Sequence, residues 1–248
     1  MKVTLLGTGD AIGTPVVGCN CPACIDGKNG GRSRRYRFSV MVESQGGKRV
    51  LIDTGPDLKW QMLENDFSHV DGVIWTHGHY DHYAGFVEFH RIQRKVDVYG
   101  LTQTLDYILD YLYFLKPVRH DVSMYESFYI GDLEFTLFEV NHPPMKNVAG
   151  VMICEGTRKV VITGDTCKDI PHRSMSLIRN ADLLIADAIV PSGFNVTKHM
   201  NSQQALRFAQ DTGAKDVVLI HLSHYFRPHD EEAENLPLGY DGMEIEVL

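Results

Sequence analysis

One short segment holds most of the residues in this chain that suit metal chemistry. Three histidines and one aspartate fall within six consecutive positions, at His77, His79, Asp81 and His82. Grouped without a cation, such side chains repel one another when protonated and lose hydration when buried. The apolar run Val73–Trp75 comes immediately before them and predicts a strand that ends in a ligand-bearing loop. A metal site is therefore favoured over the alternative, an ordinary polar surface loop.

Three further candidate ligands each follow an apolar, strand-like run. They are His142, Asp165 and His221. Functional side chains collect where strands end and loops converge, so we expect these three to meet the first segment. Together the two groups contain five histidines and two aspartates. That set suits two metal ions bridged by one aspartate.

The pattern resembles the metallo-β-lactamase superfamily. The matching motif is His77-x-His79-x-Asp81-His82, followed by His142, Asp165 and His221. The resemblance implies an α/β fold, a four-layer αββα sandwich of two mixed β-sheets flanked by helices, here as a single domain over residues 1–248. It implies that His77, His79 and His142 bind the first metal, that Asp81, His82 and His221 bind the second, and that Asp165 bridges them. Asp53 matches the superfamily's first motif and is expected to orient the ligands.

A second candidate site lies in the first thirty residues. Cys19, Cys21 and Cys24 supply three thiolates, whereas a tetrahedral structural zinc needs four ligands. His224 is the candidate for the fourth, because it lies three residues after His221 and is able to face the other way. The alternative is a reduced, solvent-facing cysteine cluster, which would be prone to oxidation. Cysteines this close together are poorly placed for disulfides, so we expect reduced thiols and a cytoplasmic protein.

The cysteine cluster and the His-x-x-His pair make the chain similar to the phosphoribosyl cyclic phosphate phosphodiesterase (PhnP) family. The similarity also includes Thr8-Gly9 and Asp241-Gly242. It implies hydrolysis of a small anionic cyclic phosphodiester, 5-phosphoribosyl 1,2-cyclic phosphate, in phosphonate breakdown. The attacking group would be a hydroxide held between two divalent ions. The resemblance favours manganese in the active site and zinc at the cysteines, and the active-site ligand types also permit zinc or iron.

A third set of residues is expected to handle protons. His199 stands just before the predicted helix Ser202–Thr212 and is the candidate general acid or phosphate-stabilising group. Asp187 ends an adjacent predicted strand, where it would orient and charge His199. Ribonuclease Z, another member of the superfamily, carries a Glu–His pair in these places. Asp81 is assigned to catalysis as well as to the metal. The alternative for His199 is a helix-start histidine without a catalytic role.

The charge balance favours a small substrate. The chain has 24 lysines and arginines against 32 acidic residues, a formal net charge of −8. Such a surface suits neither nucleic acid nor an anionic membrane, so we expect no partner of either kind. The alternative enzyme is a ribonuclease Z-like tRNA 3′-processing endonuclease, with a glyoxalase-like thioester hydrolase ranked lower. A non-catalytic zinc-binding protein is the alternative from another class. The arginines of Arg32–Arg37 either bind a substrate phosphate or form a solvated loop.

Apolar periodicity predicts the elements that carry these residues. Short β-branched runs alternate with helical patterns, which fits a layered α/β fold better than strict βαβ alternation. No apolar run is long enough to cross a membrane. The aromatic face of Thr102–Leu115 is expected in the core or in a homodimer interface. The predicted helices are Asp57–Asn65, Thr102–Leu115, Pro171–Asn180 and Ser202–Thr212, and the predicted strands are Val3–Leu6, Phe38–Val42, Arg49–Ile52, Gly72–Trp75, Val96–Tyr99, Leu133–Val140, Gly150–Cys154, Lys159–Thr163, Leu183–Ala186, Val217–Ile220 and Glu244–Val247.

Overall fold

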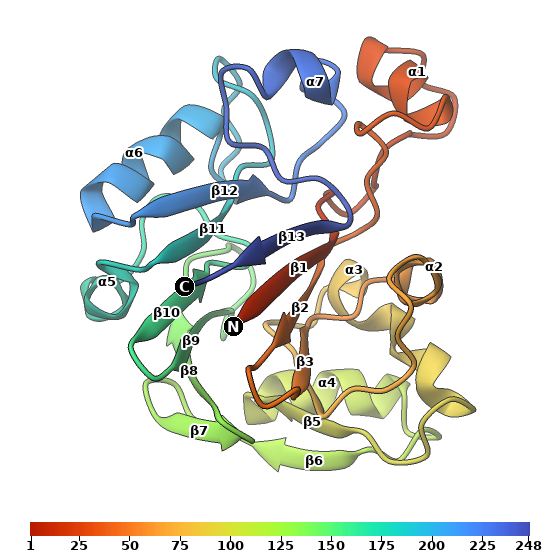
Figure 1. Ribbon diagram of the computed structural model, residues 1–248, viewed down its shortest axis with the longest axis vertical. Helices are drawn as coiled ribbons and strands as arrows, with labels where there is room; N and C mark the ends of the chain where they lie inside the picture. Colours follow the sequence, from red (N-terminus) through yellow and green to blue (C-terminus); the bar gives the residue numbers. More distant parts are fainter.

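The computed structural model describes residues 1–248 and shows two β-sheets packed face to face, with helices on both outer sides (Figure 1). The first sheet has seven strands in the order β13-β1-β2-β3-β4-β5-β6, and the second has six in the order β12-β11-β10-β9-β8-β7. Both sheets are mixed, because each contains parallel and antiparallel pairs. The predicted αββα sandwich is confirmed.

All the predicted strands and helices are present. The first sheet contains β1 (Lys2–Gly7), β2 (Ser39–Glu43), β3 (Arg49–Ile52), β4 (Gly72–Ile74), β5 (Asp97–Gly100), β6 (Val118–Asp121) and β13 (Met243–Glu246). The second contains β7 (Ser127–Ile130), β8 (Leu133–Glu139), β9 (Ala149–Glu155), β10 (Arg158–Ile162), β11 (Leu183–Asp187) and β12 (Asp216–Ile220). The helices are α1 (Pro22–Lys28), α2 (Leu58–Glu64), α3 (Tyr80–Tyr83), the 3-10 helix η1 (Ala84–His90), α4 (Thr102–Tyr111), α5 (His172–Ile178), α6 (Ser202–Thr212) and α7 (His229–Glu232). None of these helices has the length and hydrophobicity needed to cross a lipid bilayer.

The central strands are apolar on both faces because each face packs against another layer. In β3, Val50 and Ile52 pack between the two sheets, and Leu51 packs under the helices on the outer side. In β10, Val160 faces the other sheet and Val161 faces α5 and α6. Two layers of apolar packing thus fix each strand, and the loop that follows it begins from a defined position.

The start of α6 is fixed by a reciprocal pair of hydrogen bonds. The Asn201 side chain accepts a hydrogen bond of 2.9 Å from the backbone N–H of Gln204, and the Gln204 side chain accepts one of 3.0 Å from the backbone N–H of Asn201. This capping box sets where the helix begins. His199 stands two residues before the cap, so its backbone is held by the helix start.

The middle of the chain differs from the prediction. The predicted helix Thr102–Leu115 ends at Tyr111, and β6 and β7 follow where no strand was predicted. Of the two places predicted for its aromatic face, the core is wrong, because leucine and isoleucine side chains fill the buried face, and an interface between copies stays a prediction. The exposed fractions are 60% for Tyr107, 64% for Tyr111, 75% for Tyr113 and 47% for Phe114.

A close approach between two backbone segments seats α3. A Cβ atom added to Gly85, the second residue of η1, would overlap the carbonyl oxygen of Gly55 and lie 2.7 Å from Cβ of Leu58. The backbone N–H of Gly85 also donates to the carbonyl of Thr54 at 2.9 Å. The absence of a side chain at Gly85 therefore lets α3 press against the loop that follows β3.

We predict that Gly85→Ala destabilises the fold by about 1–3 kcal/mol, because a methyl group must enter a filled space. Denaturant unfolding measures this change in the free energy of unfolding. Val87→Ala, at an exposed position of η1, is the control and is expected to change stability by less than about 0.5 kcal/mol. Equal stabilities of the two variants would contradict the close approach.

Candidate metal centre

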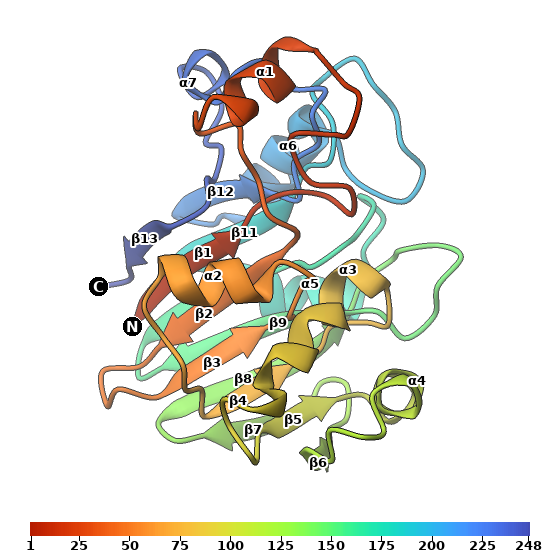
Figure 2. The same ribbon diagram turned by 90° about the vertical axis from the view of Figure 1, so that its right-hand side faces the viewer.

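The loops after the strands of both sheets converge at one end of the sandwich, on the right in Figure 2. All seven predicted ligands meet there. Every one of them is buried except His79, which is half-buried. His77 and His79 follow β4, Asp81 and His82 lie in α3, and His142, Asp165 and His221 come from the loops after β8, β10 and β12.

The first donor group consists of His77, His79, His142 and Asp165, whose donor atoms all lie within 4.8 Å of one another. Nε2 of His77 is 2.9 Å from Nδ1 of His79, and Nε2 of His142 is 3.2 Å from that same atom. Oδ2 of Asp165 lies 3.7 Å from His77 Nε2 and 3.8 Å from His142 Nε2. Ligands placed tetrahedrally at ~2.1 Å from an ion are ~3.4 Å apart. These four side chains therefore have the spacing needed to share one ion.

The second donor group contains Asp81, His82, His221 and again Asp165. Nε2 of His82 lies 3.3 Å from Asp81 Oδ2 and 3.4 Å from Asp165 Oδ1. Nε2 of His221 lies 3.6 Å and 3.3 Å from the same two oxygens. Asp165 thus turns Oδ2 toward the first group and Oδ1 toward the second, which is the arrangement of a bridging ligand.

Unpartnered polar atoms test whether these residues fit a metal. The Nε2 atoms of His82 and His221 are buried and take part in no hydrogen bond. Buried polar atoms are normally hydrogen-bonded, and each of these two nitrogens faces two carboxylate oxygens. A divalent cation would satisfy the nitrogens and the carboxylates together. The residues therefore fit a pair of divalent ions of a kind that accepts imidazole and carboxylate ligands.

The two donor groups differ in charge. Burial lowers the pKa of His77, His79 and His142, which keeps these imidazoles neutral, as metal ligands must be. Burial also acts to lower the pKa of His221, but the neighbouring carboxylates, Asp165 foremost, outweigh it and raise the pKa to about 9. The carboxylates raise the pKa of His82 in the same way, so both positions favour positive charge, which a metal cation supplies when the imidazoles are deprotonated.

Asp53 holds His82, a member of the second donor group, in place. Its Oδ2 is 2.7 Å from Nδ1 of His82, and its Oδ1 accepts a hydrogen bond of 2.8 Å from the backbone N–H of Thr76. A hydrogen bond from Nδ1 leaves Nε2 of His82 free to act as a ligand, as expected of a residue that orients the ligands. Asp53 and His221 both have a φ of 60°, which non-glycine residues rarely adopt. Backbone strain thus accompanies the site at two strand ends.

The predicted pair of Asp187 and His199 lies beside the donor groups. Nδ1 of His199 is 2.7 Å from Oδ2 of Asp187, and Nε2 of His199 has no hydrogen-bond partner in the protein. The His199 ring stacks on that of His221, with 5.0 Å between centroids and 17° between planes. Burial acts to lower the pKa of His199, but the charge and hydrogen bond of Asp187 outweigh it and raise the pKa. His199 is therefore suited to carry a proton beside the donor groups.

The three cysteines and His224 also meet, with their donor atoms within 4.8 Å of one another. The Sγ atoms of Cys19 and Cys21 lie 3.4 Å and 3.5 Å from Nδ1 of His224. Cys24 is buried in α1, so the group is partly shielded from solvent. Four thiolate and imidazole donors at this spacing match a tetrahedral zinc site, in which ligands are ~3.4–3.8 Å apart.

Sequence reasoning missed the residues that join the two clusters. His221 and His224 share the loop after β12, in which the backbone N–H of Leu222 donates a 2.8 Å hydrogen bond to the carbonyl of Thr8. Thr8 is held in turn by Asp241, whose Oδ1 accepts 2.8 Å hydrogen bonds from both the N–H and the Oγ1 of Thr8. The family motifs Thr8-Gly9 and Asp241-Gly242 were the only signal of this contact in the sequence.

The arginines of Arg32–Arg37 differ in their surroundings: Arg32 and Arg34 are exposed, as a solvated loop predicts, and binding of a substrate phosphate stays a prediction. Arg35 is buried and donates to Oγ1 of Thr8 at 2.8 Å and to the carbonyl of Gly239 at 2.6 Å, so at this position both alternatives are wrong. The other three form ion pairs, Arg32 with Asp230, Arg34 with Glu64 and Arg37 with Asp57. Each arginine of the run thus has a partner inside the protein.

The fold and its donor groups define a metal-dependent hydrolase with its metal centre at one end of an αββα sandwich. The family model for the β-lactamase superfamily domain matches residues 48–222, which is more than half of the chain. The chain belongs to the metallo-β-lactamase superfamily.

Individual relatives differ in activity. A solved structure of a diphosphatase from the PhnP family is similar with a TM-score of 0.88 and 28% identity, covering 100% of this chain and 98% of that one. The short form of human tRNase Z shares the fold, with a TM-score of 0.76 and 22% identity over 100% of both chains. An octanoyltransferase from Porphyromonas gingivalis is 30% identical over 98% of this chain and 51% of its own length. The chain thus spans about half the length of that curated relative.

We predict that Asp53→Asn weakens metal binding by about 10–100-fold, because removing an orienting partner misaligns the ligand it holds. Metal titration followed by mass spectrometry measures the affinity. Asp97→Asn is the matched control, because Asp97 forms a similar pair with His120 at 2.6 Å in the exposed part of the first sheet. The same loss of affinity in both variants would refute the role of Asp53.

Proposed function

We propose that the protein hydrolyses a small cyclic phosphodiester, with 5-phosphoribosyl 1,2-cyclic phosphate as the first candidate substrate. The observation that carries the proposal is the bridging position of Asp165 between two donor groups, with His199 stacked against one of them. The similarity to a diphosphatase of the PhnP family supports phosphoryl chemistry. Two divalent ions bound at these groups, manganese or zinc, would supply positive charge for the phosphoryl oxygens and a water of lowered pKa.

The chain's own residues supply the proton. Asp187 orients His199 through Nδ1 and favours its charged form, and the opposite nitrogen, Nε2, is left free for the substrate. In this role His199 donates its proton to the leaving oxygen when the ester bond breaks. The carboxylate of Asp187 is itself fixed by the backbone N–H of Thr166 at 2.9 Å, so the pair is preorganised. Asp81 contributes to catalysis by holding the rings of His82 and His221 in place beside Asp165.

A tRNA-processing endonuclease is the second candidate, because the shared fold of human tRNase Z favours it. The net charge of −8 and the internal pairing of the arginine run oppose it, since long anionic substrates need unpaired cations on the surface. A small substrate meets the metal centre and little else.

We also propose that Cys19, Cys21, Cys24 and His224 bind a structural zinc. The zinc would hold the loop after β12 from the side opposite His221, because His221 and His224 belong to the same loop. The cysteine cluster would then stabilise the metal centre by fixing the backbone between the two histidines.

We predict that His199→Ala keeps the full metal content and loses about 10²-fold or more in turnover of cyclic phosphodiesters, because proton donation is lost. Turnover is measured on a panel that includes 5-phosphoribosyl 1,2-cyclic phosphate, with a pre-tRNA as the competing substrate. His120→Ala, at an Asp–His pair outside the site, should retain wild-type turnover. Full activity of His199→Ala would exclude its role as the acid, and cleavage of pre-tRNA alone would favour the second candidate.

We predict that Cys24→Ala removes one equivalent of zinc and lowers the thermal stability of the protein, because a three-ligand site binds the ion weakly. Elemental analysis and thermal unfolding measure the two effects. Cys154→Ala, a half-buried cysteine outside the cluster, should keep the zinc. Unchanged zinc content in Cys24→Ala would contradict the structural site.

A further inference from the structure

Three tyrosines, Tyr83, Tyr107 and Tyr111, form an aromatic surface that the proposed reaction does not use. The ring of Tyr83 lies edge-on to both of the others, with 6.2 Å between centroids in each pair. Tyr83 is buried, whereas Tyr107 and Tyr111 are largely exposed, on the side of α4 opposite its buried leucine and isoleucine side chains. We call these three residues the tyrosine platform.

The platform adjoins the metal centre. Gly78 lies between two of the metal-site histidines, and a Cβ atom added there would lie 2.7 Å from Cδ1 of Tyr107. The Tyr107 ring therefore packs against the backbone of the ligand-bearing loop. Tyr83 directly follows His82 in the sequence. Figure 2 shows α4, which carries Tyr107 and Tyr111, at the same end of the sandwich as α3.

An open hollow of about 990 Å³ lies over the platform. None of the metal-site ligands lines it, so a substrate held at the metal centre would reach it across Tyr107, whose ring packs against Gly78. The residues that line the hollow are Tyr83, Gln103, Asp106, Tyr107, Asp110, Tyr111 and Tyr113.

The charge of the hollow restricts what it accepts. Asp106 is neutralised by Arg119, at 2.7 Å, but Asp110 forms no ion pair, and no lysine or arginine lines the hollow. A second phosphate would be repelled there. Flat tyrosine faces instead attract planar rings by stacking, and a carboxylate accepts hydrogen bonds from ring amino groups.

We propose that the tyrosine platform is a substrate subsite for an uncharged planar ring, such as a nucleobase, carried by the phosphate ester that the metal centre holds. The subsite rests on the proposed phosphodiesterase function and narrows it. 5-Phosphoribosyl 1,2-cyclic phosphate has no such ring, so it would bind at the metal centre and leave the tyrosine platform unfilled, whereas a cyclic phosphodiester that carries a ring would use both.

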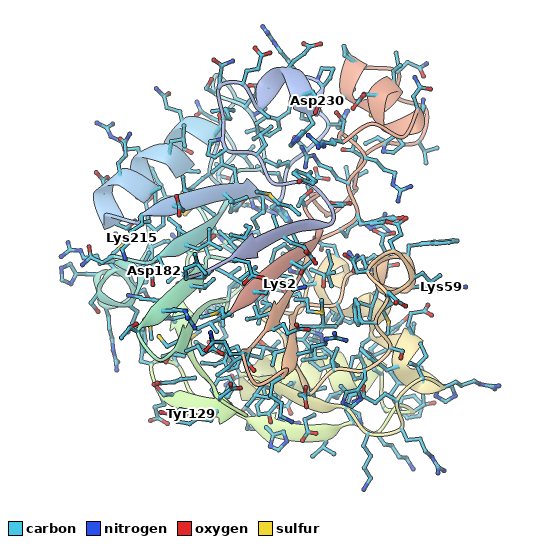
Figure 3. The ribbon with its side chains drawn as sticks, in the orientation of Figure 1. Lys2, Lys59, Tyr129, Asp182, Lys215 and Asp230 are labelled. Carbon is cyan, nitrogen blue, oxygen red and sulfur yellow. The ribbon has the colours of Figure 1, made fainter.

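Binding and turnover test the subsite separately. Calorimetry compares adenosine 5′-monophosphate with ribose 5-phosphate, two phosphate monoesters that differ by the adenine ring. We expect the metal-loaded protein to bind the adenosine compound about tenfold more tightly, since one stacked base contributes about this much. Tyr111→Ala should bring the ratio of the two affinities close to one. Tyr129→Ala should preserve it, because Tyr129 is equally exposed at 64% but lies on β7, away from α4 (Figures 2 and 3).

Hydrolysis of adenosine 2′,3′-cyclic phosphate and glycerol 1,2-cyclic phosphate provides the second comparison, with the same preference expected in kcat/KM. Equal affinities of the wild type for the two monoesters would overturn the subsite even if both diesters are hydrolysed. A preference for adenosine in binding, without hydrolysis of either diester, would support the subsite and refute the phosphodiesterase function. A dimer that dissociates in Tyr111→Ala, seen by sedimentation with no ring preference, would identify the platform as a contact between copies of the chain.

Discussion

The carboxylate of Asp165 is the group on which the site depends. It is buried between the two donor groups, and each of its oxygens faces the imidazole nitrogens of one group. A buried carboxylate is costly unless positive charge compensates it. The fold places the ligand side chains around this carboxylate because β4, β8, β10 and β12 all end at the same end of the sandwich. Apolar packing on both faces of the sheets sets where these strands end, and the buried charge requires cations at that point.

Carboxylates outside the donor groups orient the histidines around this centre. Asp53 orients His82, and Asp187 orients His199. In each pair the carboxylate holds one ring nitrogen, so the other is directed toward the reaction. Asp241 acts on backbone instead, through Thr8, and so connects the loop between His221 and His224 to the first strand. Rigid packing, oriented rings and a fixed loop together preorganise the site before any substrate binds.

The strands, the layered fold and the grouping of the seven donors could be predicted from the sequence, because each of these follows from local patterns. His77 to His82 are neighbours in sequence, and the other three donors each follow an apolar run. The Arg35 and Asp241 contacts join residues some two hundred positions apart, so no local pattern reveals them. The aromatic face of α4 was misplaced because periodicity shows which residues share a face, and only packing shows that Leu105 and Ile108 already fill the core.

The bridging of two metal ions by Asp165 is open to a direct measurement, native mass spectrometry of the protein titrated with manganese and zinc and compared with Asp165→Ala. We expect three ions per wild-type chain, two of them at the histidine and aspartate groups, and loss of both of these in Asp165→Ala while the ion at the cysteines stays. A wild-type chain with only one ion outside the cysteine cluster, or an Asp165→Ala variant that keeps two, would contradict it.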